Sequence, residues 1–168
     1  GEKIPRLQIA TDFKRPEVFT FAGDNYDFML GQEEAAQFKA LSVRSGVTLY
    51  MNTLAALSVL FYKYTGQTDI IIGSGIAGRP HSDLQGIIGM FVNMLAMRNY
   101  PEGNKKYGEF LKEVGDNALK AYENQDVQFE ELVDKLALER DPSRNPLFDI
   151  TVVVQNFEKR NSPTGEIP

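Results

Sequence analysis

The chain has no cysteine and a single histidine among its 168 residues. Without cysteine there is no disulfide framework, no thiolate metal site and no Cys–His catalytic dyad. One imidazole also excludes a histidine-rich metal site, so we expect no bound metal. A reducing, cytoplasmic setting is the simplest interpretation of a chain without cysteine.

Positive charge is also scarce, with 18 Lys and Arg residues against 23 Asp and Glu, a net charge of −5 and a pI near 5.0. The basic residues are scattered, which argues against a nucleic-acid or anionic-membrane surface. The first residues show no signal-peptide or transit-peptide pattern. No apolar run approaches the roughly 20 residues that a membrane-spanning helix needs. We therefore expect neither nucleic acid nor a membrane as a partner.

The most apolar stretch, residues 87–98, contains one amide, Asn93, and ends in one guanidinium, Arg98. Its apolar residues fall on every face of a helix, which favours a strand buried on both sides from about Met90 to Arg98. Burying an amide without a partner costs about 1–3 kcal/mol. Asn93 must therefore have a local use, and both a structural and a functional use remain open.

Apolar residues at helical spacing predict four helices, over residues 32–45, 48–65, 107–123 and 129–138. Acidic residues in the first turn suit the start of the first helix, and Gly46 suits its end. Thr48 is a good N-cap for the second helix, which Gly66 stops.

Strands are predicted over four segments, residues 18–30 (with a turn or bulge at 23–25), 69–76, 90–98 and 149–154. Residues 1–17 are predicted to form an extended linker because Pro5 and Pro16 disfavour helix in the residue before them. Residues 77–86 form a loop. Helices of this length mixed with strands indicate an α/β sandwich, either one domain or one lobe of a larger one.

No catalytic constellation emerges from the residue types. His81 follows Arg79 in a polar loop, and a solvated or capping role is favoured over a general base, which needs a positioned partner. Ser74 lies between two glycines, but the spacing and the missing helix do not fit a nucleophile elbow. We assign no catalytic residue.

Two polar stretches are rich in groups that could bind a ligand or pair with each other, residues 124–133 and 140–148. In the first, we expect Asp126 to cap the helix that follows. In the second, Arg140, Asp141 and Arg144 are expected to pair across a turn. An ion-pair cluster that holds the lobe together is favoured there over direct substrate contact.

Together these stretches resemble the condensation domain of nonribosomal peptide synthetases. The family's Ile/Val-Gly-x-Phe-Val-Asn-Thr pattern, ending in Arg, is similar to residues 88–98, although Met94 replaces Thr. Its His/Asn-Gln-Asp-x-Pro-Phe-Glu-x-Leu-Val pattern is similar to residues 124–133, although Gln128 replaces Pro. Residues 140–148 match Arg-Asp-x-Ser-Arg-Asn-Pro-Leu-Phe, and residues 73–79 resemble Gly-x-x-x-Ala-Gly-Arg. The resemblance covers nearly the whole chain.

The resemblance implies a fold similar to the C-terminal lobe of chloramphenicol acetyltransferase and other coenzyme A-dependent acyltransferases. The family's catalytic His-His-x-x-x-Asp-Gly occurs nowhere in residues 1–168 and belongs to the family's N-terminal lobe. We therefore expect an inter-lobe linker (1–17), the C-terminal lobe of a condensation domain (18–156) and a truncated bridging segment (157–168). Alone, the chain is expected to be inactive.

The implied partners are the N-terminal lobe and the donor and acceptor peptidyl carrier proteins, whose phosphopantetheine arms bring the thioesters; no cofactor is expected to bind directly. The implied role is to supply tunnel wall and carrier-protein surface while an amide forms. Residues expected at the tunnel or lobe interface are Gly78, Arg79, Gly89, Asn93, Arg98, Gln125, Asp126, Arg140, Asp141, Arg144 and Asn145. Two alternatives remain, a noncatalytic module that docks carrier proteins and a lobe of an epimerisation domain.

Overall fold

A small mixed sheet organises the protein. The computed structural model describes residues 4–20, 22–79, 81–84, 86–138 and 141–155. The sheet has the order β2–β1–β3 and consists of β1 (Ile70–Ile76), β2 (Asn93–Asn99) and β3 (Thr151–Val152). β1 runs antiparallel to β2, with Ile70 opposite Asn99, and parallel to β3, with Gly73 opposite Thr151.

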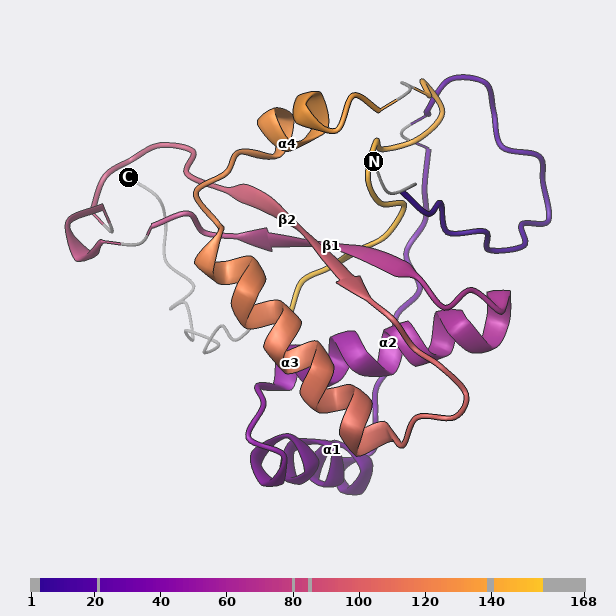
Figure 1. Ribbon diagram of the computed structural model, residues 1–168, viewed down its shortest axis with the longest axis vertical. Helices are drawn as coiled ribbons and strands as arrows, with labels where there is room; N and C mark the ends of the chain where they lie inside the picture. The colour runs from indigo at the N-terminus through magenta and orange to yellow at the C-terminus, as the bar shows by residue number, and fades with distance from the viewer. Residues whose placement is uncertain (1–3, 21, 80, 85, 139–140, 156–168) are drawn as a thin grey trace, which may run out of the picture.

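Helices α2 (Leu49–Thr65) and α3 (Tyr107–Glu123) pack together on one face of the sheet, and α1 (Gln32–Arg44) lies outside α2 (Figure 1). The larger apolar core fills this layer, and its members include Leu54, Ile70, Ile72, Leu95, Met97, Phe110, Leu111 and Val114. Burying one such side chain contributes about 1.5–3 kcal/mol. This face therefore supplies most of the hydrophobic stabilisation.

The opposite face is covered by α4 (Phe129–Lys135) and by the segment 141–148 (Figure 1). Its buried cluster is smaller and consists of Ile71, Val133, Leu147 and Phe148. The ring of Phe148 lies so close to Gly73 that a Cβ at this position would collide with it. The ring also lies 5.4 Å from the Phe129 ring. The sheet is thus covered on both faces, which confirms the predicted α/β class.

The end of α1 and both ends of α2 follow the predicted signals. The Thr48 hydroxyl accepts a hydrogen bond of 3.2 Å from the Met51 amide, and Gly66 ends α2 at φ 71°. Gly46 follows α1 at φ 67°. No single helix in the described residues is long and apolar enough to cross a membrane; α1 and α2 pass that test of length and composition only as a pair bent by 107°.

A buried amide on α2 joins the three helices of the larger layer. Asn52 is fully buried, and its Nδ2 donates to the Phe38 carbonyl at 3.1 Å and to the Ser42 hydroxyl at 3.0 Å. Its Oδ1 accepts from the Tyr107 hydroxyl at 2.7 Å. Because both polar atoms of this side chain are satisfied, its burial fixes α1 and α3 against α2.

The apolar stretch 87–98 divides into two parts. β2 begins at Asn93 rather than Met90, because its partner strand ends at Ile76, the residue opposite Asn93. Within β2, Leu95 and Met97 enter the larger core, whereas Met94 and Ala96 pack against the smaller cluster. Apolar packing on both faces is therefore confirmed for β2, but residues 87–92 form a loop.

Other strand predictions are wrong or too long. Residues 18–30 contain no strand where the structure describes them, and Tyr26, Phe28 and Met29 are exposed. A segment with alternating apolar residues forms a strand only when a neighbouring strand pairs with it through hydrogen bonds, and no described strand pairs with residues 18–30. β3 has two residues instead of the predicted segment 149–154. α4 stops at Lys135 rather than Leu138, just before Ala137 takes a positive φ of 47°.

Candidate functional site

Asn93 stands at the first position of β2 and is 5% exposed. Its Nδ2 donates to the carbonyls of Gln125 and Val127, each at 2.8 Å. Its Oδ1 accepts from the amides of Met94 at 2.8 Å and Phe129 at 3.2 Å. Two donated and two accepted bonds exhaust the capacity of an amide. Asn93 therefore fastens the start of β2 to the connection between α3 and α4.

The hydrogen bond between Asn93 and the Phe129 amide also shows that the predicted N-cap of α4, Asp126, is wrong. Asp126 is exposed, and the residue at the N-cap position is Gln128, whose side chain makes no capping hydrogen bond. The first amide of the helix, that of Phe129, instead donates to Asn93. The cap is thus supplied by a residue distant in sequence, which a search for local capping residues cannot find. Gln125 contributes its carbonyl to this contact.

Gly78, Arg79 and Gly89 meet in the loop between β1 and β2. The Arg79 guanidinium donates to the carbonyls of Leu84 and, at 3.2 Å, Gly89, and it lies 4.1 Å from the centre of the Phe91 ring. Gly78 has φ 61° and lies so close to the Phe91 carbonyl that a Cβ would collide with it. These contacts hold residues 84–91 of the loop against Gly78 and Arg79. His81 lies in the same loop and is exposed, in agreement with a solvated role.

Arg98 forms an ion pair with Asp69, the residue before β1. Its Nε and Nη2 donate to the two carboxylate oxygens at 2.9 and 2.8 Å. Both side chains are only about a quarter to a third exposed, at 26% and 30%. A two-point contact of this kind is directional, so it joins the end of β2 to the start of β1.

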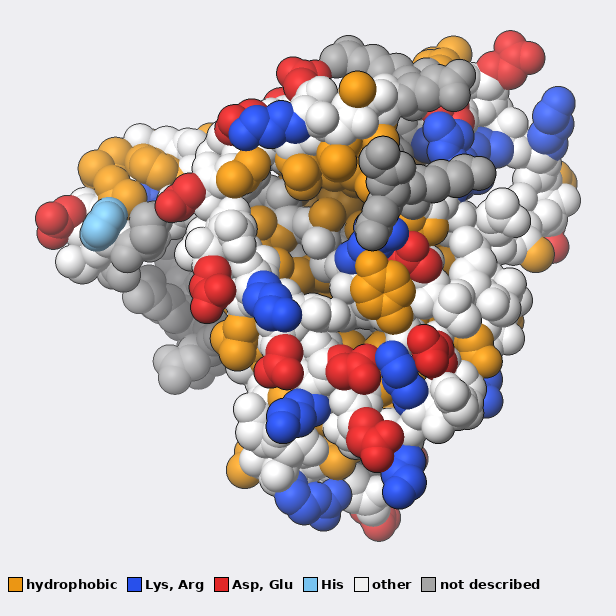
Figure 2. Space-filling model, in the orientation of Figure 1, with side chains coloured by type: hydrophobic (Ala, Val, Ile, Leu, Met, Phe, Trp, Pro, Cys, Tyr) orange, Lys and Arg blue, Asp and Glu red, His pale blue; other side chains and the backbone are white. Residues whose placement is uncertain are grey.

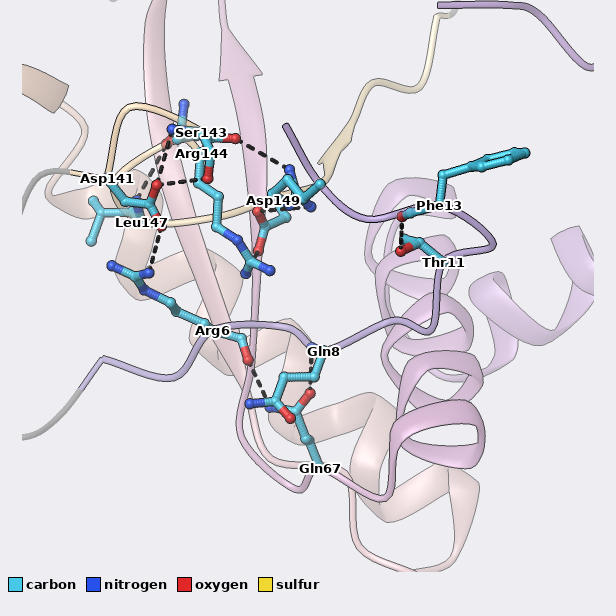
Figure 3. A network of polar contacts seen from close by, with 12 residues as sticks. Arg6, Gln8, Thr11, Phe13, Gln67, Asp141, Ser143, Arg144, Leu147 and Asp149 are labelled. Atoms are coloured by element: carbon cyan, nitrogen blue, oxygen red, sulfur yellow. Dashed lines mark hydrogen bonds and ion pairs between the residues drawn. The ribbon is translucent and has the colours of Figure 1, made fainter. Parts of the chain in front are cut away.

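Asp141 pairs with a residue far away in sequence. Its Oδ2 accepts from Arg6 at 2.8 Å, and its Oδ1 accepts from the amide and hydroxyl of Ser143 at 2.9 and 2.6 Å (Figure 3). The hydrogen bonds from Ser143, followed by the charge of Arg6, lower the pKa of this carboxyl below its usual range. The side-chain amide of Gln67 donates to the Arg6 carbonyl at 2.9 Å and accepts from the Gln8 amide at 2.7 Å. The N-terminal segment is thereby fastened to the body of the protein.

Arg144 pairs with Asp149 at 3.2 Å (Figure 3). Arg15 approaches the same carboxylate at 3.8 Å. The Asn145 side chain accepts from the Leu147 amide at 3.3 Å. Asp141 and Arg144 therefore pair with Arg6 and Asp149 rather than with each other, because a residue distant in sequence (Arg6) and one further along the turn (Asp149) are better placed. Arg140 lies outside the described residues.

The sequence-predicted residues thus fall into separate groups, and Asp141 and Arg144 line a cavity together, beside α4. A cavity of about 240 Å³ between α2, α3 and the ends of β1 and β3 is lined instead by Tyr50, Ser74, Tyr122 and neighbouring apolar residues. The Tyr50 hydroxyl is buried and has no hydrogen-bond partner in the described part of the chain. Burial raises the pKa of Tyr50 to about 12, although Ser74 nearby opposes the shift.

These hydroxyls give the cavity a neutral polar wall suited to an uncharged group. Ser74 lies within β1 and is buried, so it does not occupy a nucleophile turn. Nothing in the local sequence marks Tyr50 as a cavity residue, because the cavity forms only where α2 meets the sheet. A second cavity, of about 500 Å³, opens between α4 and residues 141–146. Phe129, Val133 and Pro142 form its apolar wall, and the charged residues that line it are Glu130, Asp134, Asp141 and Arg144.

The family model of the condensation domain matches residues 1–166. The chain belongs to the condensation-domain family. The predicted family is thereby confirmed.

Large synthases contain similar condensation sequences. Bacitracin synthase 3 of Bacillus licheniformis is 50% identical over 160 residues, which is 95% of this chain and 2% of that protein. Tyrocidine synthase 3 of Brevibacillus parabrevis is 48% identical over 167 residues, 99% of this chain and 3% of that protein. Gramicidin S synthase 2 of Brevibacillus brevis is 48% identical over 160 residues, 95% of this chain and 4% of that protein. The chain spans a small part of each.

Solved structures share the fold. A four-domain nonribosomal peptide synthetase bound to AMP and glycine matches with a TM-score of 0.85 and 24% identity, over 88% of this chain and 11% of that one. The X-domain from teicoplanin biosynthesis matches with a TM-score of 0.82 and 23% identity, over 90% and 33%. The predicted fold, that of the acyltransferase-like condensation domains, is confirmed.

Proposed function

We propose that residues 1–168 are the C-terminal lobe of a nonribosomal peptide synthetase condensation domain, and that the lobe supplies tunnel wall and carrier-protein surface for amide formation. The observation that carries this proposal is the extent of the match. The family model covers residues 1–166, yet the chain spans 33% of the solved X-domain chain and 38% of the condensation domain from the Monacolin K polyketide synthase. Such coverage is what one lobe of a larger domain would give.

The reaction joins an acceptor amine to a donor acyl group. The amine nitrogen attacks the thioester carbonyl, a C–N bond forms, the C–S bond breaks, and the donor's phosphopantetheine sulfur leaves as a thiol while the nitrogen loses a proton. The other lobe supplies the histidine that orients or deprotonates the amine. The chain alone is inactive.

The motif residues of this lobe act by holding its surfaces in place. Asn93 fixes β2 against α4 through its four hydrogen bonds, and Arg98 fixes the two long strands through Asp69. A displacement of about 1 Å in a reacting group can cost on the order of 10²-fold in rate. We assign both residues a positioning role at the tunnel wall, and Gly78, Arg79 and Gly89 a role at the lobe interface.

The test compares the isolated chain with the intact synthetase module in the presence of loaded donor and acceptor carrier proteins. Amide product, followed by mass spectrometry, is expected only from the intact module. Circular dichroism of the isolated chain must show a folded lobe, so that inactivity does not merely report unfolding. Amide formation by residues 1–168 alone contradicts the proposal.

Two further outcomes would favour an alternative function over the proposed one. Tight binding of a carrier protein by the isolated chain, unchanged when the rest of the domain is added, favours a docking module. A change in stereochemistry of a carrier-bound aminoacyl group, without an acceptor, favours an epimerisation domain. The cytoplasmic setting remains a prediction.

A further inference from the structure

A segment without helix or strand near the N-terminus, residues 4–15, lies beside residues 141–149 (Figure 3). We use the name strap for residues 4–15. Leu7 of the strap is 8% exposed and belongs to the larger core, whereas Ile4 packs against the smaller cluster. The strap therefore contacts the apolar residues of both layers of the lobe.

Arginines near the two ends of the strap bind the same short segment. Arg6 donates to the Asp141 carboxylate at 2.8 Å. Arg15 donates to the Ser143 carbonyl at 3.3 Å and lies 3.8 Å from the Asp149 carboxylate. Ser143 links the two contacts, because its hydroxyl donates to Asp141 at 2.6 Å. Figure 2 shows basic side chains gathered at the upper right of the molecule, where Figure 1 places the N-terminal segment.

The strap turns back between these two arginines. The Thr11 hydroxyl donates to the Phe13 carbonyl at 2.8 Å, and Phe13 is 86% exposed. On the side of Arg6, the Gln67 side chain binds two backbone groups of the strap, the Arg6 carbonyl and the Gln8 amide (Figure 3). The strap is thus fastened before and after an exposed turn. We use the name strap clamp for the contacts of Arg6, Arg15 and Gln67.

The strap clamp is better suited to placing the strap than to stabilising the fold. The side chains of Arg6 and Asp141 are 50% and 30% exposed, and that of Arg15 is 37% exposed. Exposed ion pairs contribute little to stability, because water and salt screen them. The contacts of the two arginines nevertheless join residues 135 and 128 positions apart in the sequence. They determine where the strap lies on the lobe.

We propose that the strap clamp fixes the direction in which the chain passes from the other lobe into this one, and thereby positions the two lobes for amide formation. This inference rests on the proposed function, which makes residues 1–17 the link between the lobes. Arg6, Arg15 and Gln67 are positioning residues, which act through the backbone of the strap. Because a displacement of about 1 Å in a reacting group can cost on the order of 10²-fold in rate, a loosened strap slows amide formation in a folded domain.

The test measures amide formation by the intact synthetase module with Arg6→Gln, Arg15→Gln and both substitutions together, at saturating concentrations of loaded carrier proteins. Lys14→Gln is the matched control, because Lys14 is an exposed cation of the same strap. The double variant is expected to have a kcat about tenfold lower than the control. Its melting temperature should stay within about 2 °C of the control. Equal kcat values overturn the proposal, and so does a loss of kcat that only follows a loss of folded protein.

A conservative substitution separates the ion pair from the loss of a long side chain. Arg6 reaches Asp141 through one nitrogen atom, so the ammonium group of Arg6→Lys can replace it. Arg6→Lys is therefore expected to keep kcat within about twofold of the native module. If Arg6→Lys is as slow as Arg6→Gln, the ion pair with Asp141 does not position the strap and the proposal fails.

Amide hydrogen exchange in the unaltered module covers the case in which a variant does not fold. The Gln8 amide donates to Gln67 at 2.7 Å, so it should exchange at least about tenfold more slowly than in an unstructured peptide of the same sequence. Exchange at the peptide rate contradicts the strap clamp. Residue-resolved mass spectrometry measures both rates.

The outcomes distinguish this inference from the proposed function. Full kcat in the double variant of an active module, together with an inactive isolated chain, defeats the strap clamp alone. Amide formation by residues 1–168 without the other lobe defeats the proposed function, and the inference that rests on it, even if the Gln8 amide is protected.

Discussion

The two faces of the sheet are built differently. On one face, α2 and α3 present long apolar stripes to the sheet, and thirteen buried residues of the described chain form a continuous core there. On the other, a helix of seven residues and an irregular segment cover a described cluster of four buried residues. Polar contacts hold that second layer, through Asn93, Asp141 and Arg144.

The difference shows how stability and the placement of surfaces are divided within one lobe. Apolar burial stabilises the α2–α3 face without demanding particular partners, whereas directional hydrogen bonds set where α4 and residues 141–148 lie. Substitutions on the α2–α3 face should therefore lower the stability of the domain. Substitutions on the opposite face should lower stability and also displace the surface formed by α4 and residues 141–148. Each expectation can be measured on the intact domain.

The largest effect is expected for Leu111→Ala, which empties a fully buried position on the α2–α3 face. Loss of burial and the resulting cavity should lower the free energy of unfolding by about 2–5 kcal/mol. Thermal and denaturant unfolding measure it. Leu119→Ala on the same helix is the matched control, because Leu119 is 55% exposed. Equal losses for the two variants would mean that α3 does not face the core as described.

Asn93→Leu tests the α4 face. The substitution leaves the Gln125 and Val127 carbonyls and the Phe129 amide without their partner, and should cost roughly 1–3 kcal/mol. Asn124→Leu is the control, because its side chain donates to the Lys120 carbonyl at an exposed site. A lower melting temperature together with slower amide formation is expected. Lost turnover at an unchanged melting temperature would instead place Asn93 in direct contact with substrate.

Asp141→Asn should act through pH, with a smaller effect than Asn93→Leu. The pKa of Asp141 is lowered from its ordinary value of 3.8, so its contribution to stability is present above that value and is lost as pH falls through the folded-state pKa. The difference in melting temperature between the native domain and the variant should therefore be constant near neutrality and shrink in acid. A difference that grows as the carboxyl is protonated contradicts the assignment. Glu130→Gln, on the exposed side of α4, provides a charge-matched control.

Tyr50→Phe is expected to have the smallest effect at neutral pH, because the hydroxyl removed is buried and has no partner among the described residues. At high pH the variant should gain an advantage. The pKa of Tyr50 is raised from 10.0 to about 12, so the unfolded chain loses this proton first and the native domain is destabilised as pH rises through that interval. Unfolding measured at neutral pH and between these two pKa values tests this. A clear loss of stability at neutral pH would reveal a hydrogen bond to Tyr50.

Local signals in the sequence predicted local structure well. The bounds of α2 and α3, the Thr48 cap and the Gly66 stop all follow from neighbours in sequence. The predictions failed at residues 18–30 and at the cap of α4, because a strand needs a pairing neighbour and the Phe129 amide finds its acceptor 36 residues away. The partners of Asp141 and Arg144 were missed for a related reason, since charge proximity along a turn does not determine which residue approaches in space.

The sequence by itself determined the family, the α/β class and the helical layer, because ordered motifs and apolar periodicity are properties of the chain alone. Only the tertiary structure decided how the apolar stretch 87–98 is used. Pairing with β1 stops at Asn93, so the residues after it are held in the sheet, while Ile88 and Met90 before it remain exposed in a loop held by Arg79. Both halves of the stretch are apolar. They differ in structure because β1 is long enough to pair only with the half that begins at Asn93.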